Sequence, residues 1–477
     1  MIVIDAVRAE GLGFFGDKAS FTPTLDSLSE DGATFLRAFS CANMTDPSLT
    51  SILTGEHPVS HGIITHGQSI IHYRKESSML ITLPQILKSM GYLTFGIDWL
   101  GKWYRKGFDF YSGLIQKSIS YRFIRKTLQY LPLNLKRLME KTTRILYAPL
   151  YKAPFPTADI HTSLASSIIE KFSDNPFFLF IHYWDTHLPY VEEKPFIDRA
   201  RSHLQKCNKD LTSFEEIVQK VCNPFFKNIF IQYAKRGLTP LDLIARYYGA
   251  ISYVDSKIGE LIKTLHQCGI FNKSIIIVTS DHGESLGEHG IYFDHAGLYD
   301  VTTHIPLIIR RHTLPSRKIN GLVQHTDIAP TILDIIGESK TLINSFNGKS
   351  LLPLIFQEKK EHRDFIVVYE SSWLSGERVA LRTSEHKLIK DAHEQKAYCS
   401  LYKHKHFPSI EFYDLKDDPY ETKNLADKFP ELVRKYSQNI EHYIYSQRSS
   451  VMRLRTIRKI KLIKSRELKN SGYEDAI

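Results

Sequence analysis

Thr45 is the residue of this chain whose type and setting best suit a nucleophile. It lies in the stretch MTDPSLTSILTG, residues 44–55, which predicts a tight turn running into a helix, with Pro47 in the first turn and Gly55 at the end. A hydroxyl at such a helix start faces unpaired backbone N–H groups and the positive end of the helix dipole, where an anionic ester would be held. The same position is also an ordinary one for a capping threonine. The residue alone leaves both interpretations open.

Acidic residues and histidines follow several of the apolar segments that read as strands. Asp5 ends IVID, and Asp281 and His282 come directly after SIIIVTS. In open α/β sheets, ligands bind beyond the carboxyl ends of the strands, so we expect these side chains to meet. Carboxylate and imidazole together suit zinc or manganese better than calcium, which prefers oxygen alone. A divalent cation there would also activate the Thr45 hydroxyl, so the metal and the nucleophile support each other.

The elements that must position these residues alternate between strand and helix. This alternation predicts an α/β fold, with a large mixed, mostly parallel sheet sandwiched by helices, followed by a small C-terminal antiparallel sheet plus helix. We expect a catalytic domain over residues 1–360, with a basic insertion at 114–152 and a polar, irregular insertion at 196–235. A C-terminal α+β subdomain would follow over 361–447, and a basic amphipathic tail over 448–477.

The composition is that of an ordinary globular protein, with 42% hydrophobic and 24% charged residues in 477. No apolar run approaches the length of a membrane span, and charges at Asp5 and Arg8 interrupt any signal-peptide region. Five scattered cysteines without a CxxC pair argue against a disulfide framework or structural zinc and favour a reducing compartment. We therefore expect a cytoplasmic protein, unless a start upstream of Met1 carries a targeting signal.

The net charge of +10 is concentrated in two segments. Residues 114–152 and residues 448–470 each hold nine Lys or Arg against a single Glu, interleaved with apolar residues. Basic amphipathic helices of this kind can lie on anionic membranes, which predicts contact with the inner membrane face. The alternative is a solvated helical face packed on the core. No nucleic-acid-reading motif accompanies the charge, so nucleic acid is not an expected partner.

Several ordered motifs resemble those of the sulfatase family of the alkaline phosphatase superfamily. The opening VIDAVRAEGLGFFG is similar to the family's first strand and metal-binding Asp, and TDPSLTSILTG aligns with its nucleophile motif, CxPSRxxLLTG. GYLTFGIDWLGKW, HYWDTHLPY, SDHGESLGEHG and FYDLKDDPYETKNLAD resemble further family blocks in the same order. The resemblance covers nearly the whole chain except residues 114–152 and the tail after about 447.

The resemblance assigns roles residue by residue. It implies that Asp5, Asp281 and His282 are metal ligands and that Thr45 is a nucleophile that also touches the metal. It further implies that Lys102 is a catalytic lysine and that His187 is a substrate-binding acid/base histidine. His295 stands where many sulfatases place a lysine against the sulfate or the leaving group.

The positions at which this chain departs from the family pattern are ones that serve formylglycine chemistry. Sulfatases convert the motif Cys or Ser to formylglycine, whereas Thr45 cannot become an aldehyde. The motif Arg is replaced by Leu49, the GKWH histidine by Tyr104, and the second Asp of the first block by Ala6. We therefore expect no formylglycine. Relatives that act on phosphate esters use Thr and often hold a second metal, for which this chain offers Asp185, His187 and His295.

These features favour a metal-dependent hydrolase that cleaves a sulfate, phosphate or phosphonate ester through Thr45, with phosphorus esters preferred. The substrate would be a small molecule, a glycan or a lipid. One alternative is a transferase, similar to the phosphoethanolamine transferases, that passes the group to a lipid or glycan acceptor. Another is a non-catalytic binding protein of the same fold. The choice among them, the number of metals and the oligomeric state stay open at this point.

Overall fold

The computed structural model describes residues 1–66, 80–99, 105–112, 157–207, 212–221, 224–372, 376–392 and 407–470. Lys102, Tyr104 and the basic segment 114–152 lie outside the described residues. Among the helices that are described, none has the length and apolarity to cross a membrane.

An eight-stranded sheet forms the centre of the molecule, as predicted. Its pairings are parallel except those of β11, which runs antiparallel to both of its neighbours. The strand order across the sheet is β12 (Arg317–Ile319), β2 (Ala33–Phe35), β11 (Leu307–Arg310), β7 (Ile276–Ser280), β1 (Ile2–Ile4), β6 (Phe177–Tyr183), β4 (Leu93–Ile97) and β5 (Phe110–Ser112).

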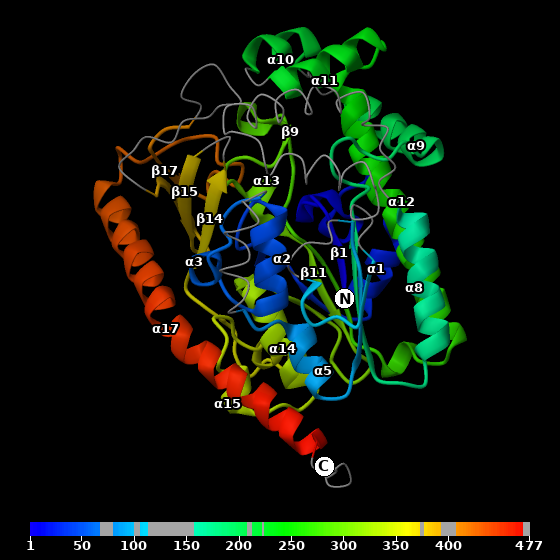
Figure 1. Ribbon diagram of the computed structural model, residues 1–477. Helices are drawn as coiled ribbons and strands as arrows, with labels where there is room; N and C mark the ends of the chain where they lie inside the picture. The colour runs from blue at the N-terminus through cyan, green and yellow to red at the C-terminus, as the bar shows by residue number, and fades with distance from the viewer. Residues whose placement is uncertain are drawn as a thin grey trace, which may run out of the picture.

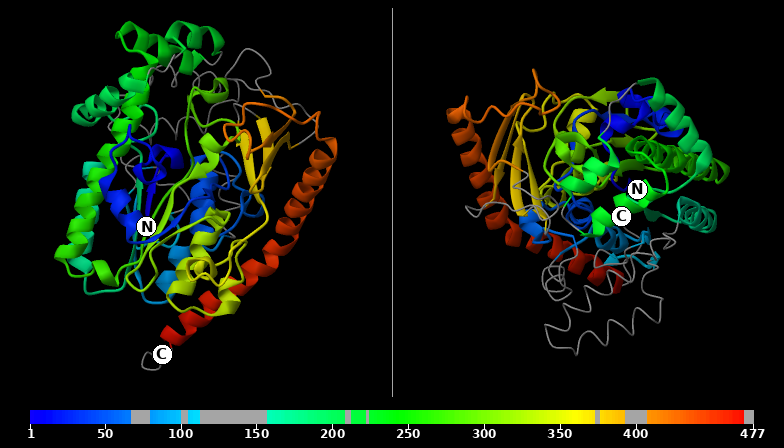
Figure 2. Two further views of the ribbon diagram at one scale, coloured as in Figure 1. Left: turned by 180° about the vertical axis from the view of Figure 1, so that it is seen from behind. Right: turned by 90° about the horizontal axis from the view of Figure 1, so that it is seen from above.

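Helices cover both faces of this sheet (Figures 1 and 2). Because successive strand residues point to opposite faces, Ile2 and Ile4 of β1 enter one apolar core and Val3 enters the other. The first core is closed by α1 (Pro23–Glu30), α8 (Ala158–Phe172) and α12 (Pro240–Gln267). The second is closed by α2 (Thr45–Thr54), α5 (Leu83–Ser89) and α14 (Ile328–Ile335).

The C-terminal part is an antiparallel sheet with a long helix, as predicted. The sheet contains β14 (Ile366–Ser372), β15 (Gly376–Arg382), β16 (His386–Asp391) and β17 (Ile410–Asp414). One helix, α17 (Pro430–Asn470), runs unbroken across residue 448, where the basic amphipathic tail is predicted to begin. In Figure 1 this helix lies along the outer side of the molecule, from the C-terminal sheet down to α15 (Lys340–Ile343).

The prediction of an irregular segment at 196–235 is wrong. The described part of this segment forms α9 (Lys194–Leu204), α10 (Phe214–Lys220) and α11 (Pro224–Lys235). Helix α9 buries Ile197, Ala200 and Leu204, a three-to-four-residue spacing that marks one helical face among polar residues. A Cβ at Gly249 of α12 would lie 2.9 Å from the Ile197 nitrogen, so the glycine permits the close approach of the two helices.

The segment ATFLRAF, residues 33–39, does not form one continuous strand, because its second half, β3 (Ala38–Phe39), leaves the central sheet. It pairs instead with β10 (His304–Ile305) and β13 (Val323–Gln324). Further short helices and strands among the described residues are α3 (Pro58–His61), β8 (Ser285–Leu286), β9 (Tyr292–Asp294), α13 (Asp300–Thr303) and α16 (Leu352–Ile355).

Candidate active site

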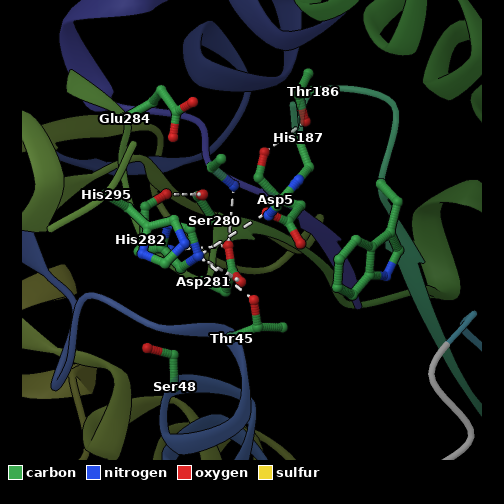
Figure 3. A network of polar contacts seen from close by, with 12 residues as sticks. Asp5, Thr45, Ser48, Thr186, His187, Ser280, Asp281, His282, Glu284 and His295 are labelled. Carbon is green, nitrogen blue, oxygen red and sulfur yellow. Dashed lines mark hydrogen bonds and ion pairs between the residues drawn. The ribbon is translucent and has the colours of Figure 1, made fainter. Parts of the chain in front are cut away.

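Two neighbouring strands deliver three candidate metal ligands to one point. Asp5 follows β1, and Asp281 and His282 follow β7. The two strands are parallel neighbours, so their carboxyl ends lie side by side. Each of the three residues offers one ligand atom within 4.8 Å of the others, and all three side chains are fully buried. Figure 3 shows the three side chains converging, with Thr45 facing them from below.

The chemistry of this cluster fits a divalent cation. Neither carboxylate oxygen of Asp5, nor Oδ2 of Asp281, has a hydrogen-bond partner among the described residues. The Nδ1–H of His282 donates to the Gly283 carbonyl at 2.9 Å, which leaves Nε2 facing Asp281 Oδ2 at 3.4 Å and Asp5 Oδ1 at 3.9 Å. Unpaired buried carboxylates are costly without a counter-charge. The arrangement is therefore the one expected of a metal site.

The electrostatics of the cluster reinforce this interpretation. Burial, and then the nearby carboxylates of Asp281 and Glu284, raise the pKa of Asp5 well above its usual value. Burial lowers the pKa of His282 to about 3, so its imidazole is neutral and able to act as a ligand. A cation bound here would remove the penalty on the ionised form of Asp5.

Thr45 is directed at this cluster and does not cap its helix. It is the first residue of α2, and the N-cap residue is Met44, which makes no side-chain capping hydrogen bond. The Thr45 hydroxyl lies 3.4 Å from His282 Nε2. All ten residues of α2 are buried, which fixes the helix in place. The helix ends at Gly55, whose φ of 61° is left-handed and where a Cβ would lie 2.5 Å from Phe346.

Two further histidines lie beside the cluster. The His295 ring centroid is 4.3 Å from that of His282 and 6.2 Å from that of His187. The Nδ1–H of His187 donates to the Leu188 carbonyl at 2.6 Å, whereas His295 Nδ1 has no partner among the described residues. Burial lowers the pKa of both imidazoles, so both are neutral near pH 7. The structure thus brings His187 and His295 to the predicted site.

The structure does not bring Asp185 together with these histidines. Its Oδ1 accepts a hydrogen bond from the Ala158 backbone N–H at 2.9 Å, at the start of α8. It thereby satisfies a helix N-terminus that the side chain of Thr157 leaves uncapped. Asp185, His187 and His295 do not form a second group with ligand atoms within 4.8 Å of one another; among the residues described, only the group around Asp5 meets that distance.

Two residues outside the predicted ligand set also meet the site: His182, which follows an apolar run of the sequence as the predicted ligands do, and Asp98. His182, near the end of β6, places Nε2 3.6 Å from Asp5 Oδ2, and its Nδ1 is 2.9 Å from Asp98 Oδ1. Burial alone would raise the pKa of Asp98, but hydrogen bonds from His182, Tyr111 and Trp184 lower it to about 2. The sequence signal was present, because Asp98 also directly follows an apolar strand, in the same way as Asp5.

The positions that depart from the sulfatase motifs have structural uses of their own. Leu49 is fully buried in the apolar core of α2 and α14. Ala6 contributes its backbone N–H, which donates to Asp281 Oδ1 at 3.0 Å. Cys41, the cysteine nearest Thr45 in the sequence, does not replace it as a nucleophile, because burial raises the pKa of its thiol to about 12 and keeps it protonated at neutral pH.

A comparison with models of known families identifies the family of this chain. The family model described as Sulfatase matches residues 1–338, which is more than half of the chain. The protein belongs to the sulfatase family. A second model, described as N-sulphoglucosamine sulphohydrolase, C-terminal, matches residues 287–450 and so includes the C-terminal sheet.

Curated relatives include sulfatases and a protein described as a multifunctional member of the alkaline phosphatase superfamily. The chain is 28% identical to human iduronate 2-sulfatase over 337 residues, covering 65% of this chain and 58% of the relative. It is 26% identical over 312 residues to the multifunctional alkaline phosphatase superfamily protein PehA of Trinickia caryophylli, covering 60% of this chain and 58% of that protein. The matched region thus spans less than two thirds of either relative.

Solved structures share the fold over nearly the whole chain. One is a protein in complex with its substrate D-glucosamine-2-N,6-O-disulfate, with a TM-score of 0.67, 17% identity, and coverage of 95% of this chain and 97% of that one. Another is a phosphonate monoester hydrolase from Silicibacter pomeroyi, with a TM-score of 0.65, 20% identity and coverage of 94% of both chains. At these identities the comparison establishes the fold and leaves the substrate open.

Proposed function

We propose that the protein is a metal-dependent hydrolase in which Thr45 attacks a phosphate, phosphonate or sulfate ester, with phosphorus esters preferred. One observation carries the proposal. The Thr45 hydroxyl lies 3.4 Å from His282 Nε2, at the edge of a buried cluster in which both carboxylate oxygens of Asp5 and Oδ2 of Asp281 have no hydrogen-bond partner among the described residues. A hydroxyl nucleophile and a cation site are the two parts that such ester chemistry needs.

In this proposal, three residues bind the cation and a fourth is the nucleophile. Asp5, Asp281 and His282 would hold the cation, and Thr45 would touch it; zinc or manganese suits this donor set better than calcium. When bound, the cation supplies positive charge that lowers the pKa of a nearby hydroxyl and offsets the charge of the ester oxygens.

Catalysis would then proceed in two displacements. The Thr45 oxygen forms a bond to phosphorus or sulfur as the bond to the leaving oxygen breaks. Water next attacks the ester on Thr45 and restores the hydroxyl. His295 lies beside His282 and His187 lies beside His295, and both are neutral, so they can accept a proton from one oxygen and return it to another. Lys102 lies outside the described residues, so its proposed role as a catalytic lysine rests only on its match to the family motif.

The preference for phosphorus esters rests on the residues that stand at the positions which sulfatases use for formylglycine chemistry. A threonine cannot be oxidised to the aldehyde, and Leu49, at the position of the motif Arg, packs in the core. The similarity in fold to a phosphonate monoester hydrolase is compatible with this preference.

A sulfate ester on a glycan is the second candidate. It is favoured by the relatives, since one is named iduronate 2-sulfatase and one solved structure holds a disulfated glucosamine as its substrate. A transferase would use the same Thr45 ester and replace water by an acceptor hydroxyl, and a non-catalytic protein would bind the anion without turnover.

A substrate panel separates these candidates. Phosphate monoesters, phosphodiesters, phosphonates and aryl sulfates are each tested with Zn²⁺, Mn²⁺ and Ca²⁺. We expect phosphorus esters to turn over with Zn²⁺ or Mn²⁺, and Thr45→Ala to lose at least about 10³-fold in rate. Thr50→Ala is the matched control, because that hydroxyl lies on the same helix and bonds the Asp46 carbonyl. Normal turnover by Thr45→Ala would show that the nucleophile is misassigned, and faster sulfate than phosphorus turnover would refute the preference.

A further inference from the structure

We propose that His182 is a further metal ligand, which coordinates through Nε2 a cation shared with Asp5. This inference rests on the metal site of the proposed function and extends it by a residue that the sulfatase resemblance does not assign. It places a second imidazole on the Oδ2 side of Asp5, next to the group of Asp5, Asp281 and His282 but outside the 4.8 Å limit of that group.

The placement of His182 follows from strand pairing. β1 and β6 are parallel neighbours, with Val3 opposite His182, and the Asp5 backbone N–H donates to the Tyr183 carbonyl at 2.8 Å. The carboxylate of Asp5 therefore leaves the sheet between two imidazoles. Its Oδ1 faces His282 Nε2 at 3.9 Å, and its Oδ2 faces His182 Nε2 at 3.6 Å.

The contact between His182 and Asp5 is too long for a hydrogen bond and is close to the spacing of two ligands on one ion. Two donors each about 2.0–2.1 Å from a tetrahedral cation lie about 3.4 Å apart. Both side chains are fully buried, and neither His182 Nε2 nor either oxygen of Asp5 has a hydrogen-bond partner among the described residues. Buried polar atoms without a partner are rare in folded proteins, and these face one another.

The other ring nitrogen of His182, Nδ1, has the carboxylate partner that is typical of metal-binding histidines. Asp98 Oδ1 lies 2.9 Å from Nδ1, so the ring proton is held there and the lone pair of Nε2 faces Asp5. Asp98 is itself fixed by the Tyr111 hydroxyl at 2.7 Å and the Trp184 indole N–H at 3.0 Å. The Trp184 ring packs edge-on against His182, with centroids 5.1 Å apart, which restricts the orientation of the imidazole.

A second imidazole has a consequence for metal selectivity. Calcium takes oxygen ligands, whereas zinc readily takes imidazole nitrogen. His182 should therefore contribute to zinc and manganese affinity and contribute little to calcium affinity. Asp98 acts through His182, and loss of such an outer partner typically weakens metal binding by 10–100-fold.

The test measures metal binding by the full chain, without reference to turnover. Dissociation constants for Zn²⁺, Mn²⁺ and Ca²⁺ are obtained by chelator competition for the wild type, His182→Gln, His182→Ala and Asp98→Asn, with folding checked by circular dichroism. His304→Gln is the control, since its ring bonds the Leu36 carbonyl, away from the cluster. We expect the His182 and Asp98 variants to bind Zn²⁺ and Mn²⁺ at least about 10-fold more weakly, or to lose an ion per chain, with Ca²⁺ binding changed by less than about threefold.

X-ray absorption of the zinc-loaded protein provides a second readout. The scattering from imidazole should fall from the wild type to His182→Gln and should be unchanged in His304→Gln. If folded His182→Gln binds zinc as the wild type does, with the same imidazole scattering, His182 is not a ligand and the proposed function stands. If the wild type itself binds no divalent cation, the metal site of the proposed function fails as well.

Discussion

Glu56 carries the strongest prediction about how the molecule is held together, because two buried arginines of α17 converge on it. Arg455 Nη2 lies 2.7 Å from Glu56 Oε2, and Arg458 Nη2 lies 2.5 Å from Oε1. Arg458 also donates to the Thr54 carbonyl at 3.0 Å, at the end of α2, and Arg455 to the Ser60 carbonyl at 3.0 Å. These contacts attach the C-terminal helix to the helix that begins at Thr45.

Replacing Glu56 by Gln keeps the shape and removes the charge that both guanidinium groups face. The Glu56 and Arg458 side chains are at most 1% exposed and Arg455 is 7% exposed, so water cannot replace the lost partner. Breaking one side of a buried ion pair costs about 3–5 kcal/mol, and we expect a loss of that size in the free energy of unfolding. The measurement is urea denaturation followed by tryptophan fluorescence.

Glu441→Gln is the matched control, because Glu441 lies on α17, the helix that carries Arg455 and Arg458. Glu441 is 70% exposed and pairs with Lys390 at 3.4 Å, so its loss should cost about 0–1 kcal/mol. A Glu56→Gln variant as stable as this control would refute the reasoning. The prediction also bears on the basic tail, because Arg455 and Arg458 are engaged inside the protein and are not free to meet a membrane. Membrane-surface contact by the remaining basic residues, and the cytoplasmic location, stay predictions.

Two further outcomes are expected. Asp185→Asn should leave metal content unchanged, because Asp185 accepts from the Ala158 N–H, a bond that an amide oxygen can also accept; loss of an ion on elemental analysis would instead support a second metal site. Burial lowers the pKa of His57 from 6.5 to about 4, so the unfolded chain binds its proton first as pH falls. Stability from this group is complete above pH 6.5 and is lost on acidification towards pH 4, by up to about 3 kcal/mol. His57→Gln should therefore show a shallower acid decline in thermal unfolding than the wild type, and parallel declines would contradict the assignment.

The sequence predicts the central sheet well because its inner strands are continuous apolar runs. β1, β6 and β7 are each buried on both faces, and such runs can be recognised without knowing their neighbours. The cluster of Asp5, Asp281 and His282 follows from the same feature, since polar residues at strand ends share one edge of the sheet.

The pairs missed by the sequence analysis depend on the order of strands and on contacts distant in the chain. His182 meets Asp98 only because β4 lies next to β6, and alternation of strand and helix does not specify that order. Arg455 and Glu56 are 399 residues apart, so the sequence alone suggests two charged side chains exposed to solvent. Only the packing of α17 shows that they form a buried ion pair. Polar helices such as α9 were missed because their apolar face is narrow.

The covalent state of Thr45 during turnover tests the central proposal most directly. The wild type is quenched in acid while it hydrolyses a phosphorus ester with Zn²⁺ or Mn²⁺, and the peptide spanning residues 38–55 is sequenced by mass spectrometry. We predict one phosphoryl group on Thr45 and no aldehyde in that peptide. A phosphoryl group on another residue, or a formylglycine in the peptide, would contradict the account.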